Sequence, residues 1–132
     1  MKKLLFIFIC FLAIASNCKK KTAKDHLVGS WGILNYIENG VEKTSDFNLI
    51  YQGYKITFDA KGNYKEYYRN VFGIETNISG TWTLESNNLQ LILVDNDPNS
   101  TNKLRTFNVL TPITDTELNV GETNKEYDLR RN

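Results

Sequence analysis

A glycine stands two residues before a tryptophan at two places in this 132-residue chain, Gly29-Ser30-Trp31 and Gly80-Thr81-Trp82. In an extended strand, residues two apart point to the same face, so each glycine shares a face with its tryptophan. The glycine lets the backbone coil and approach a neighbouring strand, while the indole fills the enclosed space. We therefore expect both pairs to form the floor of a small, tightly coiled β-barrel.

Short segments bounded by turns continue this pattern to the end of the chain. Apolar and polar residues alternate strictly over 54–59 and 81–84, as is typical of an antiparallel sheet with one buried face. No helical pattern of useful length is present. The sequence predicts an all-β domain, an eight-stranded antiparallel up-and-down β-barrel, with strands over 28–37, 49–58, 63–69, 76–84, 89–94, 103–110, 116–120 and 125–130.

The connections between these strands alternate in length. Those at 59–62, 85–88 and 111–115 are short, whereas 38–48 and 95–102 are longer and 70–75 is intermediate. Alternate connections of an up-and-down barrel lie at opposite ends. We expect a closed end floored by the two tryptophans and an open end whose rim loops carry Phe47, Val71, Phe72 and Ile74.

Residues 1–17 are predicted to be a lipoprotein signal peptide. A basic start is followed by an uncharged run, Leu4 to Ala15, which is too short to span a bilayer comfortably. Ala15-Ser16-Asn17-Cys18 resembles the lipobox of bacterial lipoproteins, in which the cysteine carries the lipid, although Asn17 replaces the usual Gly, Ala or Ser. The alternative is an ordinary secretory signal with an incidental Cys18. Because Cys10 would leave with the signal, Cys18 would lack a disulfide partner, which favours a palmitate-bearing lipid anchor there.

Residues 18–26 are predicted to be the lipidated cysteine and a flexible tether, and 27–132 to be the barrel. The tether lysines would favour anionic headgroups, or merely keep the tether soluble. Residues 27–132 carry ten Lys or Arg against fourteen Asp or Glu, a net charge of about −4, which argues against a nucleic-acid partner.

The sequence offers no recognisable catalytic or metal-binding group. His26 is the only histidine and lies in the predicted tether, so a histidine-based acid/base pair is excluded. Asp95-Asn96-Asp97-Pro98-Asn99 resembles the start of a calcium loop but lacks the required glycine and glutamate. We expect a non-enzymatic protein with no metal and no cofactor.

Gly29-Ser30-Trp31 resembles the Gly-x-Trp motif of lipocalins, and residues 27–129 look like the small lipocalin-like lipoproteins of Bacteroidetes. The stretches that carry the resemblance are 27–31, 56–64 and 79–84. In lipocalins the motif tryptophan packs at the closed end beneath an arginine from the last strand. The resemblance implies a structural floor of Gly29, Trp31, Gly80, Trp82 and Arg131. The alternation along the last strand predicts that Arg131 points inward, whereas a register shift of one residue would place Arg130 there.

Glu66 shares a face with Tyr64 and Tyr68 in the strand predicted over 63–69. If that face points inward, Glu66 is a carboxylate among aromatic rings that could anchor a polar ligand group. We favour the other interpretation, in which Glu66 lies near a barrel end and reaches water, because buried lone carboxylates are rare.

We expect a monomer anchored in the bacterial cell envelope, at the periplasmic face of the outer membrane. The sequence is compatible with two functions for it. The barrel could bind a small hydrophobic or amphipathic molecule, for which the candidate residues are Ile33, Ile37, Phe47, Tyr54, Ile56, Phe72, Leu91 and Phe107. Alternatively, a solidly packed barrel could act as a protein-interaction, envelope-assembly or inhibitor module. Eight strands leave room only for side chains or one small ligand, so both are physically available.

Overall fold

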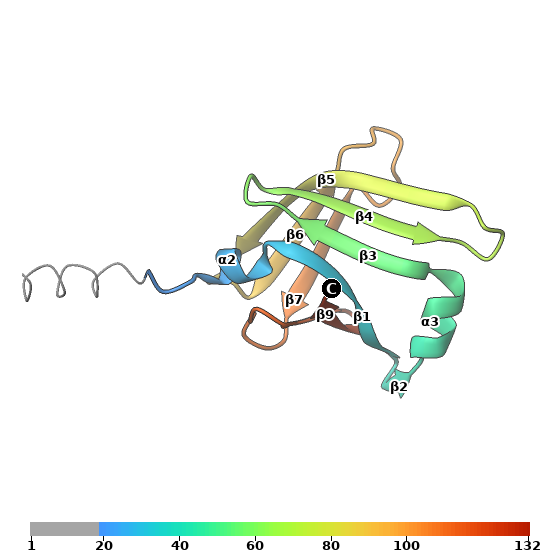
Figure 1. Ribbon diagram of the computed structural model, residues 1–132, viewed down its shortest axis with the longest axis horizontal. Coiled ribbons are helices and arrows are strands. Elements are labelled where there is room, and N and C mark those ends of the chain that lie inside the picture. Colours follow the sequence, from blue (N-terminus) through green and yellow to red (C-terminus); the bar gives the residue numbers. More distant parts are fainter. Residues whose placement is uncertain (1–18) are drawn as a thin grey trace, which may run out of the picture.

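The computed structural model describes residues 19–132, so the predicted signal peptide and Cys18 lie outside the described residues (Figure 1). One antiparallel sheet runs in the order β2-β1-β3-β4-β5-β6-β7-β8-β9, and β1 also pairs with β9. Eight strands thus close into a barrel, which confirms the predicted fold, and the two-residue β2 only extends a hairpin from β1. The strands are β1 Gly29–Glu38, β2 Val41–Glu42, β3 Gln52–Phe58, β4 Asn63–Arg69, β5 Glu75–Glu85, β6 Gln90–Asp95, β7 Leu104–Val109, β8 Glu117–Glu122 and β9 Lys125–Arg131.

A short helix, α2 (Ala23–Leu27), stands where a flexible tether was expected for residues 23–26. It begins with a capping box in which the Thr22 hydroxyl accepts from the Asp25 N–H and the Asp25 carboxylate accepts from the Thr22 N–H. Leu27 is fully buried in the core. The expectation of a tether is wrong here because the cap and one apolar anchor suffice to fix a single turn.

A second helix, α3 (Thr44–Ile50), occupies part of the predicted 38–48 loop and the first residues of the strand predicted over 49–58. The strand itself begins only at Gln52. Phe47 is the one buried residue of α3. A helix this short is stabilised by packing rather than by its own propensity, so the sequence carries no periodic pattern that predicts it.

The two ends of the barrel differ as the connection lengths predict. In Figure 1, α2 and the short turns after β3 and β5 lie at one end, and α3 lies at the other. The 110–116 connection is also at the α2 end, because Asp115 contacts Lys21 and His26. We call the α2 end the closed end and the α3 end the open end.

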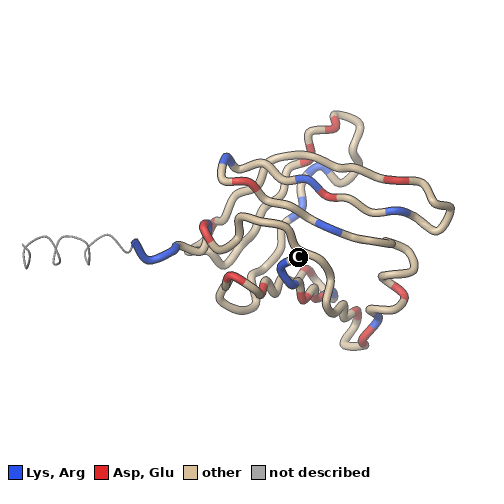
Figure 2. The backbone as a smooth tube through the Cα atoms, viewed as in Figure 1, with Lys and Arg blue, Asp and Glu red and all other residues tan. Residues whose placement is uncertain are grey.

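The core lies at the closed end, where the most completely buried large side chains are Trp31, Tyr64, Phe58, Leu27, Leu93 and Leu118. Charged residues of both signs are spread along the strands and loops of the barrel, and Lys19, Lys20 and Lys21 follow one another where the described chain enters that end (Figure 2). Within residues 19–132, no helix is long and apolar enough to cross a membrane.

Candidate functional site

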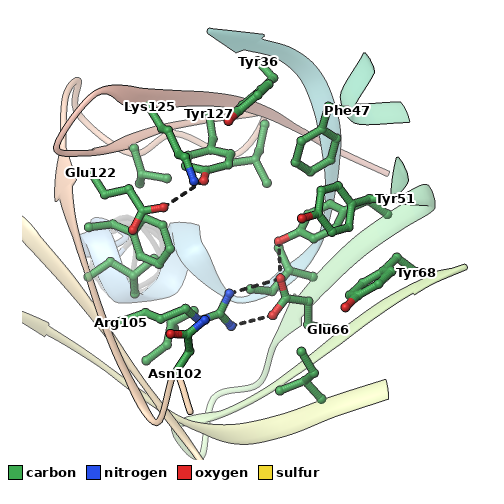
Figure 3. Close-up of a pocket in the computed structure, with 18 of the residues that line it drawn as sticks. Tyr36, Phe47, Tyr51, Glu66, Tyr68, Asn102, Arg105, Glu122, Lys125 and Tyr127 are labelled. Carbon is green, nitrogen blue, oxygen red and sulfur yellow. Dashed lines mark hydrogen bonds and ion pairs between the residues drawn. The ribbon is translucent and has the colours of Figure 1, made fainter. Parts of the chain in front are cut away.

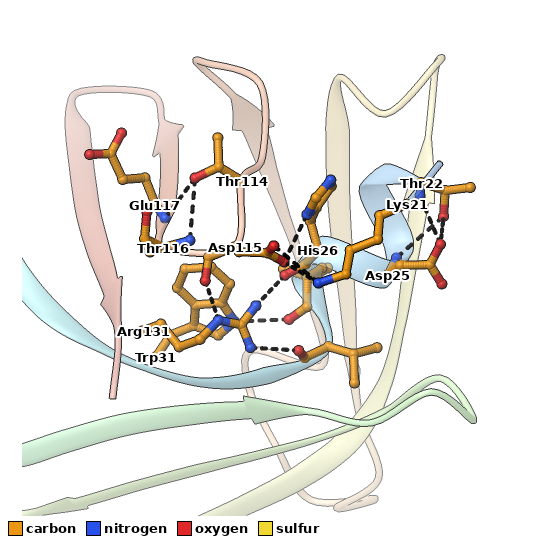
Figure 4. Close-up of polar contacts among 12 residues, drawn as sticks. Lys21, Thr22, Asp25, His26, Trp31, Thr114, Asp115, Thr116, Glu117 and Arg131 are labelled. Atoms are coloured by element: carbon orange, nitrogen blue, oxygen red, sulfur yellow. Dashed lines mark hydrogen bonds and ion pairs between the residues drawn. The ribbon is translucent and has the colours of Figure 1, made fainter. Parts of the chain in front are cut away.

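The floor of the barrel is built on Trp31 and Arg131. Trp31 is fully buried, and its indole N–H donates to the Leu27 carbonyl at 2.8 Å. The Arg131 guanidinium lies 4.6 Å from the centre of the Trp31 ring. It also donates to the backbone carbonyls of Val28, His26 and Asp115, so it joins the last strand to α2, β1 and the 110–116 connection (Figure 4).

Both floor glycines are required by close approaches. Gly29 has a φ of +143°, and a Cβ there would lie 1.8 Å from an Arg131 nitrogen. A Cβ on Gly80 would lie 1.9 Å from the Val94 carbonyl oxygen. Any other residue at these positions would force strands apart or displace Arg131.

Trp82 completes the floor beside the first tryptophan. It is 6% exposed, packs edge-on against Phe58 and donates from its indole N–H to the Asp59 carbonyl at 3.1 Å. Both tryptophans belong to one buried core, and Arg131 lies over Trp31 and against Gly29. Arg131 rather than Arg130 faces inward, since Arg130 pairs with Glu117 at the surface.

Above this floor the barrel encloses a cavity of about 560 Å³. Five of the predicted ligand-binding residues line it, namely Phe47, Tyr54, Ile56, Leu91 and Phe107. Residues from all eight barrel strands and from α3 line the space (Figure 3). The interior is thus not filled by side chains.

Two candidates on β1, Ile33 and Ile37, do not line this cavity, and Ile37 is displaced by a β-bulge between Ile33 and Asn35. The extra residue reverses the alternation, so Leu34 is exposed and Tyr36 points inward instead of Ile37. Ile33 packs against the floor core. Ile37 lines a separate depression of about 250 Å³. The sequence offers no glycine at the bulge that would have revealed it.

Phe72 lies on a turn at the open end, as predicted (Figure 1), but its predicted place among the ligand-binding residues is wrong. It is 84% exposed in the turn between β4 and β5 and does not line the cavity. The Asn70 side chain accepts from the backbone N–H groups of Phe72 and Ile74 and so fixes this turn.

A buried ion pair lies inside the cavity. Two nitrogens of Arg105 donate to the two carboxylate oxygens of Glu66, at 3.3 and 2.5 Å, and the Tyr54 hydroxyl donates to the same carboxylate at 2.8 Å (Figure 3). Glu66 is only 5% exposed. The favoured expectation that it reaches water is wrong, because Arg105 provides the partner that a buried carboxylate needs.

Arg105 was missed by the sequence reasoning although a signal was present. It lies two residues before Phe107 on the predicted strand 103–110, so alternation places both side chains on the same inner face. Its guanidinium lies about 6 Å from the ring centres of Tyr64 and Phe107. Burial lowers the pKa of Arg105, but hydrogen bonds and charge attraction from Glu66 outweigh burial and raise it overall.

An aromatic cluster lines the mouth around Phe47 of α3. The Phe47 ring centre lies 5.0 Å from that of Tyr36, 4.7 Å from Tyr51 and 5.4 Å from Tyr54. Tyr127 joins the cluster from β9, at 5.2 Å from Tyr36. Sequence reasoning identified Phe47 and Tyr54 but not the other three tyrosines, whose positions depend on the bulge, on α3 and on barrel closure.

The tyrosine hydroxyls of this cluster face carboxylates. Burial, reinforced by Glu66, raises the pKa of Tyr54 well above its ordinary value. Burial, reinforced by a hydrogen bond to Glu122 at 2.9 Å, likewise raises the pKa of Tyr127. Both hydroxyls therefore keep their protons at neutral pH. Within residues 19–132, no three His, Cys, Asp or Glu side chains are grouped so as to hold a metal ion.

The closed barrel, the tryptophan under an arginine and the interior cavity agree with the family comparison. Residues 27–120 match the family described as a lipocalin-like domain. This chain belongs to the lipocalin-like family. No curated protein matches the sequence.

Solved structures from Bacteroides species share the fold of this lipocalin-like chain. A lipocalin-like protein from Bacteroides uniformis is 17% identical with a TM-score of 0.63, covering 81% of this chain and 99% of that one. An uncharacterized protein from Bacteroides eggerthii is 18% identical with a TM-score of 0.61, covering 80% and 99%. A further Bacteroides uniformis protein, solved by NMR, is 18% identical with a TM-score of 0.53, covering 82% and 90%. At these identities the likeness shows the fold alone.

Proposed function

We propose that this protein is a lipid-anchored lipocalin-like lipoprotein of the bacterial cell envelope that binds a small hydrophobic or amphipathic molecule inside its barrel. The observation that carries this proposal is the cavity of about 560 Å³. Its volume lies within the range of about 300–1,000 Å³ that is usual for small-molecule sites. Its walls combine apolar and aromatic side chains with charged and polar ones, which suits a molecule that has both an apolar and a polar part.

The buried polar group supports an amphipathic rather than a purely apolar ligand. Glu66, Arg105 and Tyr54 lie within the cavity rather than at the surface. A ligand whose polar group reaches them would replace water that otherwise hydrates them, while its apolar part contacts Ile56 and Leu91. Because both Glu66 oxygens are already engaged, we propose a binding role and no catalytic one.

The direction of chain entry supports an arrangement in which the mouth faces away from the anchoring membrane. Cys18 directly precedes Lys19, and the described chain enters the barrel at the closed end (Figure 1). Lys21 pairs there with Asp115 at 2.9 Å. A lipid on Cys18 would place this end next to the bilayer, and ligands would enter from the aqueous side. Labelling with radioactive palmitate, and its loss in Cys18→Ala, tests the anchor.

The alternative is a protein-interaction module that carries no ligand. The exposed apolar side chains of Val71, Phe72 and Ile74 on the turn between β4 and β5 would provide its contact surface. The unfilled interior weighs against it, because a barrel without a ligand gains stability by packing its centre.

Native mass spectrometry of the protein purified from its host without detergent separates the two functions. We expect a small molecule of discrete mass to co-purify with the wild type. It should be lost in Ile78→Trp, which fills the cavity wall beside Glu66, and retained in Ile37→Trp, which adds the same ring outside the cavity. A co-purifying protein with an empty barrel would instead support the interaction module.

A further inference from the structure

We propose that the cavity selects ligands with a positively charged nitrogen head, an amine on an apolar body, over ligands that carry a carboxylate on the same body. This inference rests on the proposed binding function and adds the charge class of the ligand. It is carried by the charges, the hydroxyl orientations and the aromatic faces around the cavity.

The cavity lining carries more negative than positive side chains. Five acidic and three basic residues line it: Glu38, Asp46, Glu66, Asp95 and Glu122 against Lys43, Arg105 and Lys125. The barrel domain as a whole is also acidic. A concave site with one dominant sign of charge concentrates ligands of the opposite sign.

Each basic residue already faces a carboxylate. Arg105 holds Glu66 with two hydrogen bonds, and Lys43 lies 3.7 Å from Glu38. Lys125 is the cross-strand partner of Glu122 in the β8–β9 register. An anionic head would have to compete with these carboxylates for its cation and would bring a second negative charge beside them. Among residues 19–132, neither Asp46 nor Asp95 forms an ion pair, so these two carboxylates account for the excess negative charge.

Two of the five tyrosines that line the cavity donate their protons to carboxylates. The Tyr54 hydroxyl donates to Glu66 at 2.8 Å, and the Tyr127 hydroxyl donates to Glu122 at 2.9 Å. The lone pairs of both phenol oxygens remain as acceptors. An ammonium group, which only donates, fits such acceptors, whereas a carboxylate, which only accepts, does not.

The aromatic faces at the mouth favour the same charge. Tyr36, Phe47, Tyr51, Tyr54 and Tyr127 surround the upper part of the cavity beneath α3 (Figure 3). The face of an aromatic ring attracts a cation, and groups of such rings are a recurrent way of recognising ammonium ligands. Burial, and next the charge of Glu38, raise the pKa of Tyr36.

Isothermal titration calorimetry with three probes of one chain length tests the proposal. The probes are decylammonium, decanol and decanoate, each below its micelle concentration, added to the full chain carrying Cys18→Ala so that no lipid is attached. We expect decylammonium to bind at least about tenfold more tightly than decanoate, with decanol between them. If decanoate or decanol binds as tightly as decylammonium, the charge selectivity is overturned while the binding function stands. If no probe binds, the proposed function itself fails.

Matched variants separate a built site from general attraction to an acidic protein. Glu122→Gln removes one charge inside the cavity and keeps an oxygen that accepts from Tyr127. Glu117→Gln removes one charge outside the cavity, from the surface pair with Arg130. We expect the preference for decylammonium to fall at least about threefold in Glu122→Gln only. Equal falls in both variants, or no fall in either, would overturn the proposal.

Discussion

Arg131 and Trp31 stack at the closed end of the barrel, with the guanidinium carbon 4.6 Å from the centre of the indole ring. Because the guanidinium also holds three backbone carbonyls, one side chain near the end of the chain fixes α2, the start of β1 and the 110–116 connection. This contact joins three segments at the closed end, and the cavity opens at the opposite end.

Removing the Arg131 side chain should lower the free energy of unfolding far more than removing the side chain of Arg130. Arg131→Ala loses the stacking and leaves partly buried carbonyls without donors, so we expect the free energy of unfolding to fall by about 2–4 kcal/mol. Arg130→Ala breaks only an exposed pair and should cost less than about 1 kcal/mol. Urea unfolding of both variants measures the difference, and equal losses would contradict this description of the floor.

Phe47 should anchor α3 over the mouth. It is 7% exposed and contacts four other rings, whereas Phe72 is 84% exposed. We expect Phe47→Ala to speed amide hydrogen exchange across residues 44–50 while leaving the strands of the closed end protected. Phe72→Ala makes the same chemical change at an exposed site and should leave exchange unaltered. Unchanged exchange in Phe47→Ala would show that other contacts hold the helix.

The Glu66–Arg105 pair should show strong energetic coupling. Arg105→Met or Glu66→Gln alone leaves a buried group without its partner and should cost about 3–5 kcal/mol. The double variant should lose less free energy of unfolding than the two single variants together, with a coupling energy of about 1–3 kcal/mol. The exposed pair Arg69–Glu75 is the control and should couple by less than about 1 kcal/mol. A double-mutant cycle from denaturant unfolding gives both values, and similar couplings would indicate that Glu66 is solvated.

Stability should fall at alkaline pH because buried tyrosines must ionise. The pKa values of Tyr54 and Tyr127 in the folded protein lie above the ordinary value of 10.0. Groups with raised pKa values stabilise the fold fully below the pKa of the unfolded state, and that stability is lost as the pH rises through the folded pKa. Ultraviolet titration of phenolate should therefore show a tyrosine fraction that ionises only as the near-ultraviolet dichroism of the fold disappears. Ionisation of every tyrosine near its ordinary pKa, with dichroism retained, would contradict their burial.

The fold could be predicted from the sequence because its signals are local. Glycine–tryptophan pairs, alternation and the lengths of connections indicate the barrel, its closed end and the inward side chain of Arg131. The α2 turn was missed because a capping box and one apolar residue form it, and α3 because Phe47 alone anchors it. Neither produces a repeating pattern.

The cavity could be predicted only in part, since its geometry depends on contacts between distant strands. Tyr54, Ile56, Leu91 and Phe107 follow simple alternation and line it as expected. The prediction that Ile37 lines the cavity was wrong because the bulge in β1 shifts the alternation by one residue. The prediction that Glu66 reaches water was wrong because its partner, Arg105, lies three strands away in the sheet. Only the folded barrel brings the two side chains together.

Binding of the neutral fluorescent probe N-phenyl-1-naphthylamine tests the central claim, a cavity that accepts a small apolar molecule, without depending on ligand charge. In the Cys18→Ala background we expect saturable fluorescence enhancement at one probe per chain, abolished by Ile78→Trp and retained by Ile37→Trp. No enhancement, or enhancement that Ile78→Trp leaves unchanged, would contradict it.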